Sequence, residues 1–354
     1  MKYLHIMHND KFIKDYIKFI NKNLDMEEHF FFIFSREDIN DKRFENFKNI
    51  EIIKIEKKIL NYLKLIKVYR HLYELAVISE KIIVHSLLEI RVVMFFNLFK
   101  KLTRKSYWYI WGGDLYDYIY SNTSIKRKIH YIVSRKIKSM FKGYITHIRG
   151  DYKLAQKWYS AKGKYLECLM YPSNLYKEVK LKEEKKEYLA IQIGNSATFT
   201  NNHFEVFEKL KKHKNKNIKI YCPLSYGNKK YAEKVVKKGK DIFGEKFILM
   251  TEFLEYSKYL EFLSQIDIAI FAHDRQQAVG NITSLLSMKK TVYLKKEVTT
   301  YDMLEKLGVK IKLFDNLDSL EIFEEEVLEK NREIIKERFS EKRLIEDLEK
   351  IFND

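Results

Sequence analysis

Short apolar runs alternate with longer segments of helical spacing along the whole chain. The short runs, rich in Ile, Val, Phe and Tyr, predict β-strands, and the longer amphipathic segments predict helices. The predicted strands are residues 3–7, 29–35, 50–55, 81–85, 106–111, 143–148, 188–193, 218–222, 247–250, 266–271 and 291–294. The predicted helices include residues 12–23, 57–79, 86–102, 125–142, 255–263 and 278–288, with another starting at Phe204. This alternation predicts an α/β protein built on doubly wound parallel sheets.

The stretch from Gln265 to Leu294 shows this pattern most clearly, as strand, helix and strand. Such a βαβ unit implies a parallel sheet, and ligands of open parallel sheets lie beyond the carboxyl ends of the strands. The residues at that place are His273, Asp274, Arg275, Gln276 and Gln277, followed by Gly280 and Asn281. An Arg fork beside two amides suits a phosphate or a sugar. A solvated connecting loop is the alternative.

Two more strand ends in the second half carry candidate binding residues. Gly194, Asn195 and Ser196 form a turn between a strand and a helix, where backbone N–H groups and small polar side chains can cradle an anion. The turn is neither a dinucleotide fingerprint nor a P-loop, because their glycine spacing is absent. Tyr226, just beyond the strand at 218–222, can stack on a nucleobase.

Strand ends in the first half carry ionisable residues. His8 and Asp10 follow the first strand, and His85 ends the fourth. His147 and Arg149 lie at the end of the strand predicted at 143–148. These positions suit a ligand. Asp10 can equally well be the N-cap of the following helix.

The segment from Trp111 to Asp114 contains two consecutive glycines, Gly112 and Gly113, after an aromatic strand. Glycines let a backbone approach a ligand closely or fold sharply. This arrangement predicts Asp114 as a carboxylate at the carboxyl edge of the sheet.

The 354 residues suffice for two ordinary domains. A charged linker at Lys180–Glu187 places the predicted boundary. We therefore expect one domain at residues 1–180, a second at 186–330, and a C-terminal helical segment at 331–354. The charged region from Glu321 to Phe352 suits one helix or a pair of helices.

The net charge of +18 is distributed unevenly. Residues 1–180 hold 35 Lys and Arg against 19 Asp and Glu, whereas residues 181–354 hold 32 against 30. The excess in the first half indicates an anionic partner. Eleven basic residues and two acids lie between Lys100 and Lys142, where a basic amphipathic helix follows the very apolar segment 86–102. This favours an anionic membrane surface, although an ordinary surface helix would look similar.

Several function classes fit the composition less well. A nucleic-acid-binding protein would also be basic, but no recognised nucleic-acid motif is present. Cys168 and Cys222 have neither metal-site spacing nor disulfide density, which favours a reducing compartment. Residues 1–7 are too short for a signal peptide, and no apolar run reaches the roughly 18 residues of a membrane span. No acidic pair at metal-ligand spacing follows a strand, so we expect neither a metal nor another cofactor.

Motifs in both halves resemble those of one known family. The matching residues are Asp10, the segment 110–116, Arg149-Gly150-Asp151, Gly194-Asn195-Ser196, Asn202-His203, Tyr226, Tyr259-Leu260, Asp267, Arg275-Gln276-Gln277 and Gly280. In this order they are similar to the 4-acetamido-4,6-dideoxygalactose (Fuc4NAc) transferases of enterobacterial common antigen synthesis, glycosyltransferase family 56. The chain departs from the family pattern after Ser196 and at His273-Asp274.

The resemblance implies a fold and a reaction. The family has the GT-B fold, in which two Rossmann-like domains face a cleft. It moves Fuc4NAc from a TDP-sugar to a polyprenyl-diphosphate-linked saccharide, which would place this chain peripherally on the cytoplasmic face of the plasma membrane. A transferase of the same fold with another nucleotide-sugar or acceptor is the alternative.

The resemblance also divides the candidate residues between two tasks. The residues expected to bind the donor nucleotide are Gly194, Asn195, Ser196, Tyr226, Arg275, Gln276, Gln277, Gly280 and Asn281. Those expected on the acceptor side are His8, Trp111, Gly112, Gly113 and Arg149. Deprotonating the acceptor hydroxyl requires a general base. Asp114 is the first candidate for that base, with Asp10, His147, His8 and His85 in reserve.

Overall fold

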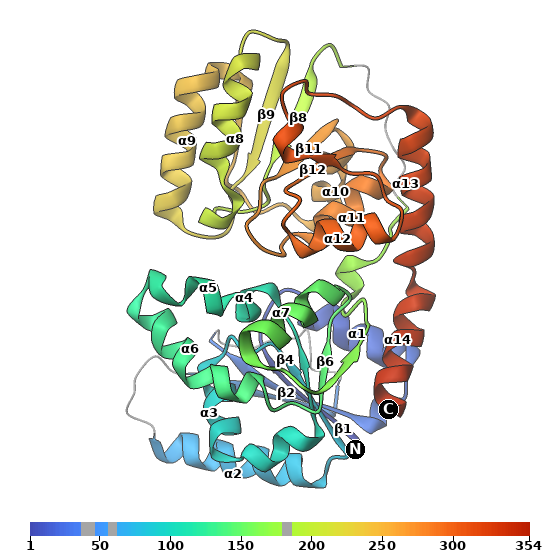
Figure 1. Ribbon diagram of the computed structural model, residues 1–354. Coiled ribbons are helices and arrows are strands. Elements are labelled where there is room, and N and C mark those ends of the chain that lie inside the picture. Colours follow the sequence, from blue (N-terminus) through green and yellow to red (C-terminus); the bar gives the residue numbers. More distant parts are fainter. Residues whose placement is uncertain (37–46, 56–61, 179–185) are drawn as a thin grey trace. The chain divides into compact units, whose positions relative to one another are not determined.

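The computed structural model describes residues 1–36, 47–55, 62–178 and 186–354 (Figure 1). The described chain divides into two compact units. The first contains Met1–Ser173 and Lys342–Asp354, and the second contains Asn174–Glu341. This division differs from the expected one, because the chain changes unit before the charged linker and its last helix belongs to the first unit. The linker residues 180–185 lie outside the described residues.

The first unit contains a parallel sheet in the order β3-β2-β1-β4-β5-β6-β7. Its strands are β1 (Tyr3–His8), β2 (His29–Ser35), β3 (Ile50–Lys54), β4 (Lys81–His85), β5 (Ser106–Tyr109), β6 (Gly143–Ile145) and β7 (Lys164–Leu166). The strand order reverses between β1 and β4, and such a switch point is where open α/β sheets bind ligands. The carboxyl ends of β1 and β4 therefore mark the first place to look for a site.

Helices lie on both faces of this sheet (Figure 1). They are α1 (Ile13–Asn23), α2 (Tyr62–Ile78), α3 (Ile90–Leu98), α4 (Gly112–Leu115), α5 (Asp117–Tyr120), α6 (Ile125–Lys138), α7 (Arg149–Tyr159) and α14 (Glu341–Asn353). Side chains of a strand point alternately to the two faces. In β1, Leu4 and Ile6 join the core formed with α2, α3, α6 and α7, whereas Tyr3 and His5 contact α14 and α1.

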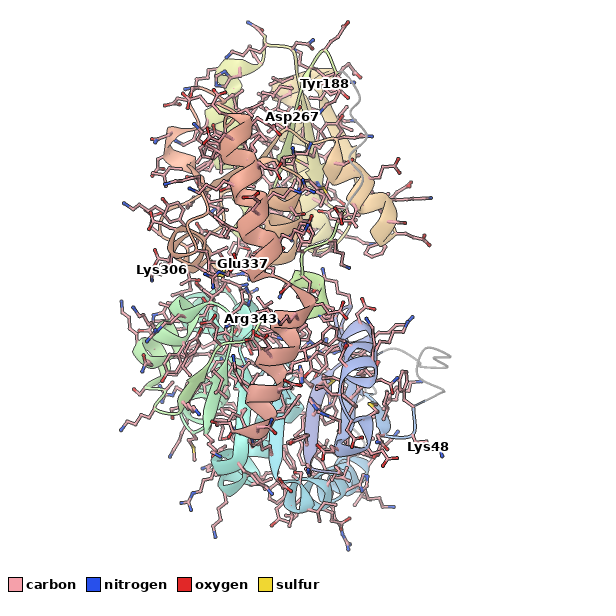
Figure 2. All side chains as sticks on the ribbon, turned by 90° about the vertical axis from the view of Figure 1, so that its right-hand side faces the viewer. Lys48, Tyr188, Asp267, Lys306, Glu337 and Arg343 are labelled. Carbon is pink, nitrogen blue, oxygen red and sulfur yellow. The ribbon has the colours of Figure 1, made fainter. Side chains whose placement is uncertain are left out.

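The C-terminal helix α14 is tied to the first unit by polar contacts. The buried Lys81 ammonium donates to the carbonyl oxygens of Ile351 (3.0 Å) and Phe352 (2.8 Å). A cation at this end satisfies carbonyls that no helical N–H reaches and complements the helix dipole. Arg343, labelled in Figure 2, pairs with Asp347 at 2.9 Å and with Glu167 after β7 at 3.4 Å.

The second unit contains a parallel sheet in the order β10-β9-β8-β11-β12-β13. Its strands are β8 (Leu189–Ile193), β9 (Ile218–Pro223), β10 (Phe247–Met250), β11 (Ile268–Phe271), β12 (Thr291–Leu294) and β13 (Lys312–Leu313). Its helices are α8 (His203–Leu210), α9 (Lys229–Phe243), α10 (Tyr256–Ser264), α11 (Val279–Ser287), α12 (Thr299–Lys306) and α13 (Glu325–Arg338). The switch point here lies between β8 and β11.

All eleven predicted strands are present, and β2, β4, β10 and β12 have the predicted bounds. The helix predicted at 86–102 is shorter, because Glu89 accepts from the Arg91 N–H as the N-cap of α3. Of the two uses left open for Gly112 and Gly113, a sharp fold is absent, since both residues are helical and neither has a positive φ. The charged C-terminal region is a pair of helices, α13 and α14, in different units. Residues 57–61 of the helix predicted at 57–79 lie outside the described residues.

Among the described residues, the pattern overlooked seven strands and α-helices, namely β7, β13, α4, α5, α7, α9 and α12. The two strands are only three and two residues long, which is too short for a period to be visible. Among the described residues, no helix is both long and apolar enough to cross a membrane.

Candidate functional site

The turn after β8 is the first element of a site in the second unit. Gly194 has φ +63°, and a Cβ there would lie 2.6 Å from Asn201 Oδ1, so only glycine fits. The next N–H, that of Asn195, donates to the same Asn201 oxygen at 3.0 Å. The Asn201 amide nitrogen donates in turn to the Ser196 carbonyl (3.0 Å) and to Thr198 Oγ1 (2.7 Å). A buried asparagine thus fixes the conformation of the Gly194–Ser196 turn.

The turns after β8, β9 and β11 meet through amide side chains. Gln277 Nε2 donates to Asn195 Oδ1 at 2.9 Å, and Asn195 Nδ2 donates to Tyr226 Oη at 2.7 Å. Thr200 Oγ1 donates to Gln277 Oε1 at 2.8 Å. Asn195 and Gln277 are 7% and 8% exposed, so their bonds are largely shielded from water. Three of the predicted nucleotide residues therefore form one network at the carboxyl edge of this sheet.

Cationic groups border the same edge. Arg275 donates to the Gln276 carbonyl at 2.9 Å, and this contact turns its side chain back along its own loop. Lys295, just after β12, pairs with Glu205 (2.7 Å) and Asp274 (3.2 Å). Burial lowers the pKa of Lys295, but the two carboxylates outweigh burial and raise it above its ordinary value. Lys295 therefore remains charged beside the loop.

Helix α11 begins at this edge without a side-chain cap. The preceding residue, Ala278, is in the left-handed region with φ +59°. Gly280 and Asn281 lie in the first turn of the helix, where backbone N–H groups have no helical acceptor. The positive end of the helix dipole lies at the same place. An anion at this edge would meet the helix N-terminus and the Arg275 loop together.

The first unit has a cavity of about 270 Å³ at its own carboxyl edge. The residues around it come from the ends of β1, β2 and β3 and from the turn before α3: His8, Asn9, Phe34, Ser35, Arg36, Ile55, Leu88 and Glu89. His8 Nδ1 and Asp10 Oδ1 are buried and have no hydrogen-bond partner among the described residues. Burial lowers the pKa of His8 below its ordinary value although Asp10 and Glu89 oppose this. His8 is therefore neutral near pH 7 and able to accept a proton.

Glu89 gives the cavity a charged wall. Its side chain is buried and accepts from the Arg91 guanidinium at 2.8 Å and from Arg36 Nη2 at 3.4 Å. Both arginines remain in part exposed. Charge-assisted bonds of this kind fix a carboxylate in place. A sugar hydroxyl entering the cavity would meet an imidazole, an amide and a carboxylate.

Trp111 connects this edge to a row of buried polar groups. Its ring lies against His8, with centroids 4.9 Å apart, and its Nε1 donates to Tyr171 Oη at 3.0 Å. Tyr171 Oη bonds to His85 Nδ1 at 2.8 Å. The row continues from His85 Nε2 to His5 Nδ1 (3.1 Å) and from His5 Nε2 to His29 Nδ1 (2.9 Å).

The three histidines of this row are neutral. Burial lowers the pKa of His29 to about 4 and holds those of His5 and His85 well below 6.5. Neutral rings can share single protons along the row, each donating at one nitrogen and accepting at the other. The row thereby holds Tyr171, and through it Trp111, in a fixed orientation.

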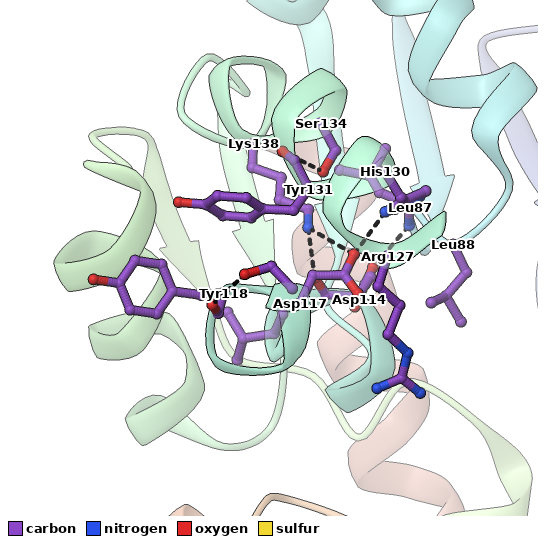
Figure 3. A network of polar contacts seen from close by, with 12 residues as sticks. Leu87, Leu88, Asp114, Asp117, Tyr118, Arg127, His130, Tyr131, Ser134 and Lys138 are labelled. Carbon is purple, nitrogen blue, oxygen red and sulfur yellow. Dashed lines mark hydrogen bonds and ion pairs between the residues drawn. The ribbon is translucent and has the colours of Figure 1, made fainter. Parts of the chain in front are cut away.

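Asp114, the first candidate for the general base, is completely buried (Figure 3). Its Oδ2 accepts from the Leu87 N–H at 2.7 Å and from Trp108 Nε1 at 2.8 Å. The buried Lys138 ammonium donates to its backbone oxygen at 2.6 Å. Burial raises its pKa to about 6, although Lys138 and the two bonds oppose this. These contacts join the turn after β4 to β5 and α6.

The other first-half candidates lie apart from His8. His147 follows β6, its ring nitrogens have no partner among the described residues, and burial lowers its pKa to about 4. Arg149 begins α7 and lies over the Tyr165 ring at 5.9 Å. Gly112 and Gly113 form the start of α4, where Gly113 faces the Leu88 side chain. Of the predicted acceptor residues, Trp111 has its ring against that of His8.

Several residues of the two edges were not predicted. In the second unit they are Thr200 and Asn201; Asn201 Oδ1 lies 3.0 Å from Nε2 of His273, which the sequence already placed at this edge. In the first unit they are Arg36, Glu89 and Tyr171. Asn201 lies close in sequence to predicted residues, so the strand-end rule could have included it. Nothing in the sequence marks Tyr171, because its partners come from three other segments, at residues 12–16, 85 and 109–111.

Comparisons with known proteins bear on both units. The model of the family "4-alpha-L-fucosyltransferase glycosyl transferase group 56" matches residues 5–336. Among solved structures, an Anabaena HepE complex with UDP and glucose has a TM-score of 0.70 at 10% identity, covering 100% of this chain and 99% of that one.

Two other solved structures match similarly. A glycosyltransferase from Rickettsia africae has a TM-score of 0.66 at 13% identity, covering 99% of this chain and 98% of the other. WaaG, a glycosyltransferase involved in lipopolysaccharide biosynthesis, has a TM-score of 0.61 at 12% identity, covering 99% of this chain and 98% of that one. These likenesses and the two parallel sheets confirm the predicted GT-B fold. Because the family model spans nearly the whole chain, the protein is a glycosyltransferase and belongs to the 4-alpha-L-fucosyltransferase family, glycosyl transferase group 56.

Proposed function

We propose that this glycosyltransferase moves a Fuc4NAc-like deoxy-amino sugar from a TDP-sugar to a polyprenyl-diphosphate-linked saccharide. The observation that carries the proposal is the convergence of three turns in the second unit through Gln277, Asn195 and Tyr226. That network lies at the topological switch point, beside the uncapped start of α11 and the Arg275 loop. An exposed aromatic ring, neutral amides and an anion-binding helix end together suit a nucleoside diphosphate.

The donor residues would act mainly on the leaving diphosphate. Negative charge develops on its oxygens as the bond to the sugar breaks, and fixed donors at that place lower the barrier. Arg275 and the backbone N–H groups of Gly280 and Asn281 supply positive potential there. Asn195 and Ser196 belong to the turn after β8, which lies at the same edge of the sheet. The solved HepE complex contains a nucleoside diphosphate and a sugar, which supports this class of donor.

His8 is the general base that this geometry favours. The acceptor hydroxyl oxygen forms a bond to the anomeric carbon, the bond from that carbon to the diphosphate oxygen breaks, and the hydroxyl proton passes to His8 Nδ1. His8 lines a cavity and is neutral, as a base must be. Asp10 stabilises the imidazolium that results. Asp114, with its carboxylate directed at Leu87 and Trp108, positions the turn that holds Glu89.

The acceptor places the enzyme at the cytoplasmic face of the plasma membrane, attached peripherally. A lipid-linked saccharide carries a diphosphate and cannot leave the bilayer. The charge of residues 1–180, 35 basic against 19 acidic, suits such a partner.

A thermal-shift panel of nucleotides and nucleotide-sugars tests the proposed donor. A ligand that binds only the folded state raises the melting temperature in proportion to its occupancy, so TDP and TDP-sugars should give the largest shifts. A larger shift with UDP or GDP would assign another donor to the same site. If no nucleotide shifts the melting temperature, the proposed donor site is wrong.

A further inference from the structure

Helix α6 exposes an apolar face. Ile125, Ile129 and Ile132, spaced by four and three residues, lie on one side of the helix and are 81%, 55% and 52% exposed. We call these three side chains the isoleucine face. The sequence pattern of this helix favoured a membrane surface, and the exposure of its apolar stripe agrees with that expectation. Large apolar side chains gathered on one exposed face indicate an interaction surface.

Basic residues surround the isoleucine face. Lys126, Arg127, Lys128, Arg135 and Lys136 are all exposed on the same helix. The two acids between Lys100 and Lys142, Asp114 and Asp117, are both buried. The exposed part of this stretch is therefore positively charged without a nearby carboxylate from the same stretch. An anionic partner would gain from every one of these charges.

The opposite side of α6 is fixed to the fold (Figure 3). Lys138 is fully buried and pairs with Asp117 at 3.4 Å, and His130 Nδ1 lies 2.7 Å from the same carboxylate. Asn97 of α3 donates to the Val133 carbonyl at 3.0 Å. On the same side Ile137 is completely buried in the core, and Tyr131 and Val133 pack against that core. The isoleucine face is consequently free to meet a partner without any change in the helix.

We propose that the isoleucine face docks α6 onto an anionic phospholipid bilayer. The inference deepens the proposed function, since it rests on a lipid-linked acceptor and names the surface that reaches the lipid. The isoleucines enter the boundary between headgroups and acyl chains, and the flanking Lys and Arg bind lipid phosphates. A helix with this division of side chains lies in the plane of a membrane surface. On α3, which bonds to α6 through Asn97, the apolar side chains of Met94 and Leu98 are also exposed, at 42% and 65%.

The chemistry favours a bilayer over other occupants. Nucleic acid would use the basic residues but has no place for aliphatic side chains on its phosphate backbone. A second copy of the chain would bring two basic faces together, which repel each other. An anionic bilayer accommodates both kinds of side chain at once.

Vesicle sedimentation with the full chain tests the proposal. The wild type should bind phosphatidylglycerol vesicles at low salt, bind less at high salt and bind phosphatidylcholine vesicles weakly. The variant Ile125→Ser/Ile129→Ser/Ile132→Ser should bind at least about a hundredfold more weakly, because each isoleucine contributes about tenfold. The variant Lys126→Gln/Lys128→Gln/Lys136→Gln should lose about fivefold per charge removed. Unchanged melting temperatures would show that both variants fold.

Helix α9 provides the matched control. It is also basic, but Ala232, Val235 and Phe243 are buried, so it offers charge without an exposed apolar face. The variant Lys230→Gln/Lys234→Gln/Lys237→Gln should bind vesicles like the wild type. Equal losses from the α6 and α9 charge variants would overturn the proposal, because binding would then follow net charge alone.

Two other results would also overturn the proposal. One is an isoleucine variant that binds vesicles as strongly as the wild type. The other is a lipid-free dimer that becomes monomeric in the isoleucine variant, which would make a second copy the occupant. Failure of the proposed function has a different signature, namely vesicle binding by the wild type with no nucleotide that raises its melting temperature.

Discussion

The carboxyl edges of the two sheets are built from different chemistry. In the second unit, amides and hydroxyls bond to one another, and Asn195, Asn201 and Gln277 all have hydrogen-bond partners. In the first unit, ionisable groups line the edge, and His8 Nδ1 and Asp10 Oδ1 have no partner among the described residues. Neutral amides keep their shape over a wide range of pH, whereas an imidazole changes charge near neutrality. This difference supports the proposed roles, which are ligand binding at one edge and proton transfer at the other.

Replacing His8 should have the largest effect and would break the comparison most directly. In His8→Gln we expect kcat to fall about 10²–10⁴-fold, the range for a general base, because Gln cannot accept the hydroxyl proton. The affinity for TDP should remain that of the wild type. Steady-state kinetics with saturating donor and calorimetry with TDP measure the two quantities. A wild-type kcat would remove His8 from the mechanism and make Asp10→Asn the next variant to measure.

The stability of the first unit should depend on pH through its buried histidine row. Below about pH 6.5 the unfolded chain binds protons at His5, His29 and His85, whereas the folded chain does not. The free energy of unfolding should therefore decrease as the pH is lowered, by about 2 kcal/mol per histidine between pH 7 and pH 5. For His29 the loss is complete near its folded pKa of about 4. Asp114, with its pKa raised to about 6, opposes the trend because the folded state binds its proton first.

Urea unfolding at pH 7 and pH 5 measures this dependence. The slope of the unfolding free energy against pH measures the number of protons taken up on unfolding. The variant His29→Asn should reduce that number by about one. If wild type and variant give the same slope, the histidine row does not govern acid sensitivity.

Arg275 tests the binding edge of the second unit. Replacement by Ala should weaken TDP binding by about 1.5–3 kcal/mol, the range for a charge-assisted contact, and leave the pH dependence of kcat unaltered. Arg338→Ala, at an exposed position on α13, provides the control and should bind TDP normally. Calorimetric affinities of the two variants give the answer. Equal affinities would mean that the diphosphate lies away from the Arg275 loop.

Variants of Asp114 distinguish a positioning role from a role in proton transfer, and we expect them to change kcat less than His8→Gln does. Asp114→Ala leaves the N–H groups of Leu87 and Trp108 without an acceptor, so the unfolding free energy should fall by about 1–3 kcal/mol. Asp114→Asn keeps an acceptor oxygen and should retain most of the stability and a kcat within about tenfold of the wild type. Loss of kcat by a factor above 10² in a stable Asn variant would return Asp114 to the role of general base.

The sequence predicted the strand ends of both edges because burial and alternation are local properties. Period and composition place Gly194, Arg275 and His8 after strands, and topology then brings strand ends together. The partners of each side chain are not local. Asn195 and Gln277 are 82 residues apart, and their bond depends on rotamers that no pattern records. Asp114 was placed at the right edge, but the pattern could not show that its carboxylate turns inward to Leu87.

The orientation of α6 was left open by the sequence for a related reason. Its basic amphipathic pattern suits a membrane surface and an ordinary surface helix alike, and the buried Lys138, Asp117 and His130 contacts fix the side that faces the fold. A lysine inside the fold contradicts the ordinary preference of that residue for the surface. Likewise, the membership of α14 in the first unit depends on the Lys81 contacts to its last carbonyls.

The return of α14 to the first unit has a consequence for biosynthesis. The first unit is discontinuous, made of Met1–Ser173 and Lys342–Asp354, whereas the second is the continuous segment Asn174–Glu341. A ribosome completes the second unit before it has made the helix that covers Tyr3 and His29. Domains usually fold in the order of synthesis, but here the N-terminal sheet is made first and lacks the helix over Tyr3 and His29 until the last residues are synthesised. During that interval a chaperone would find its substrate in the first unit.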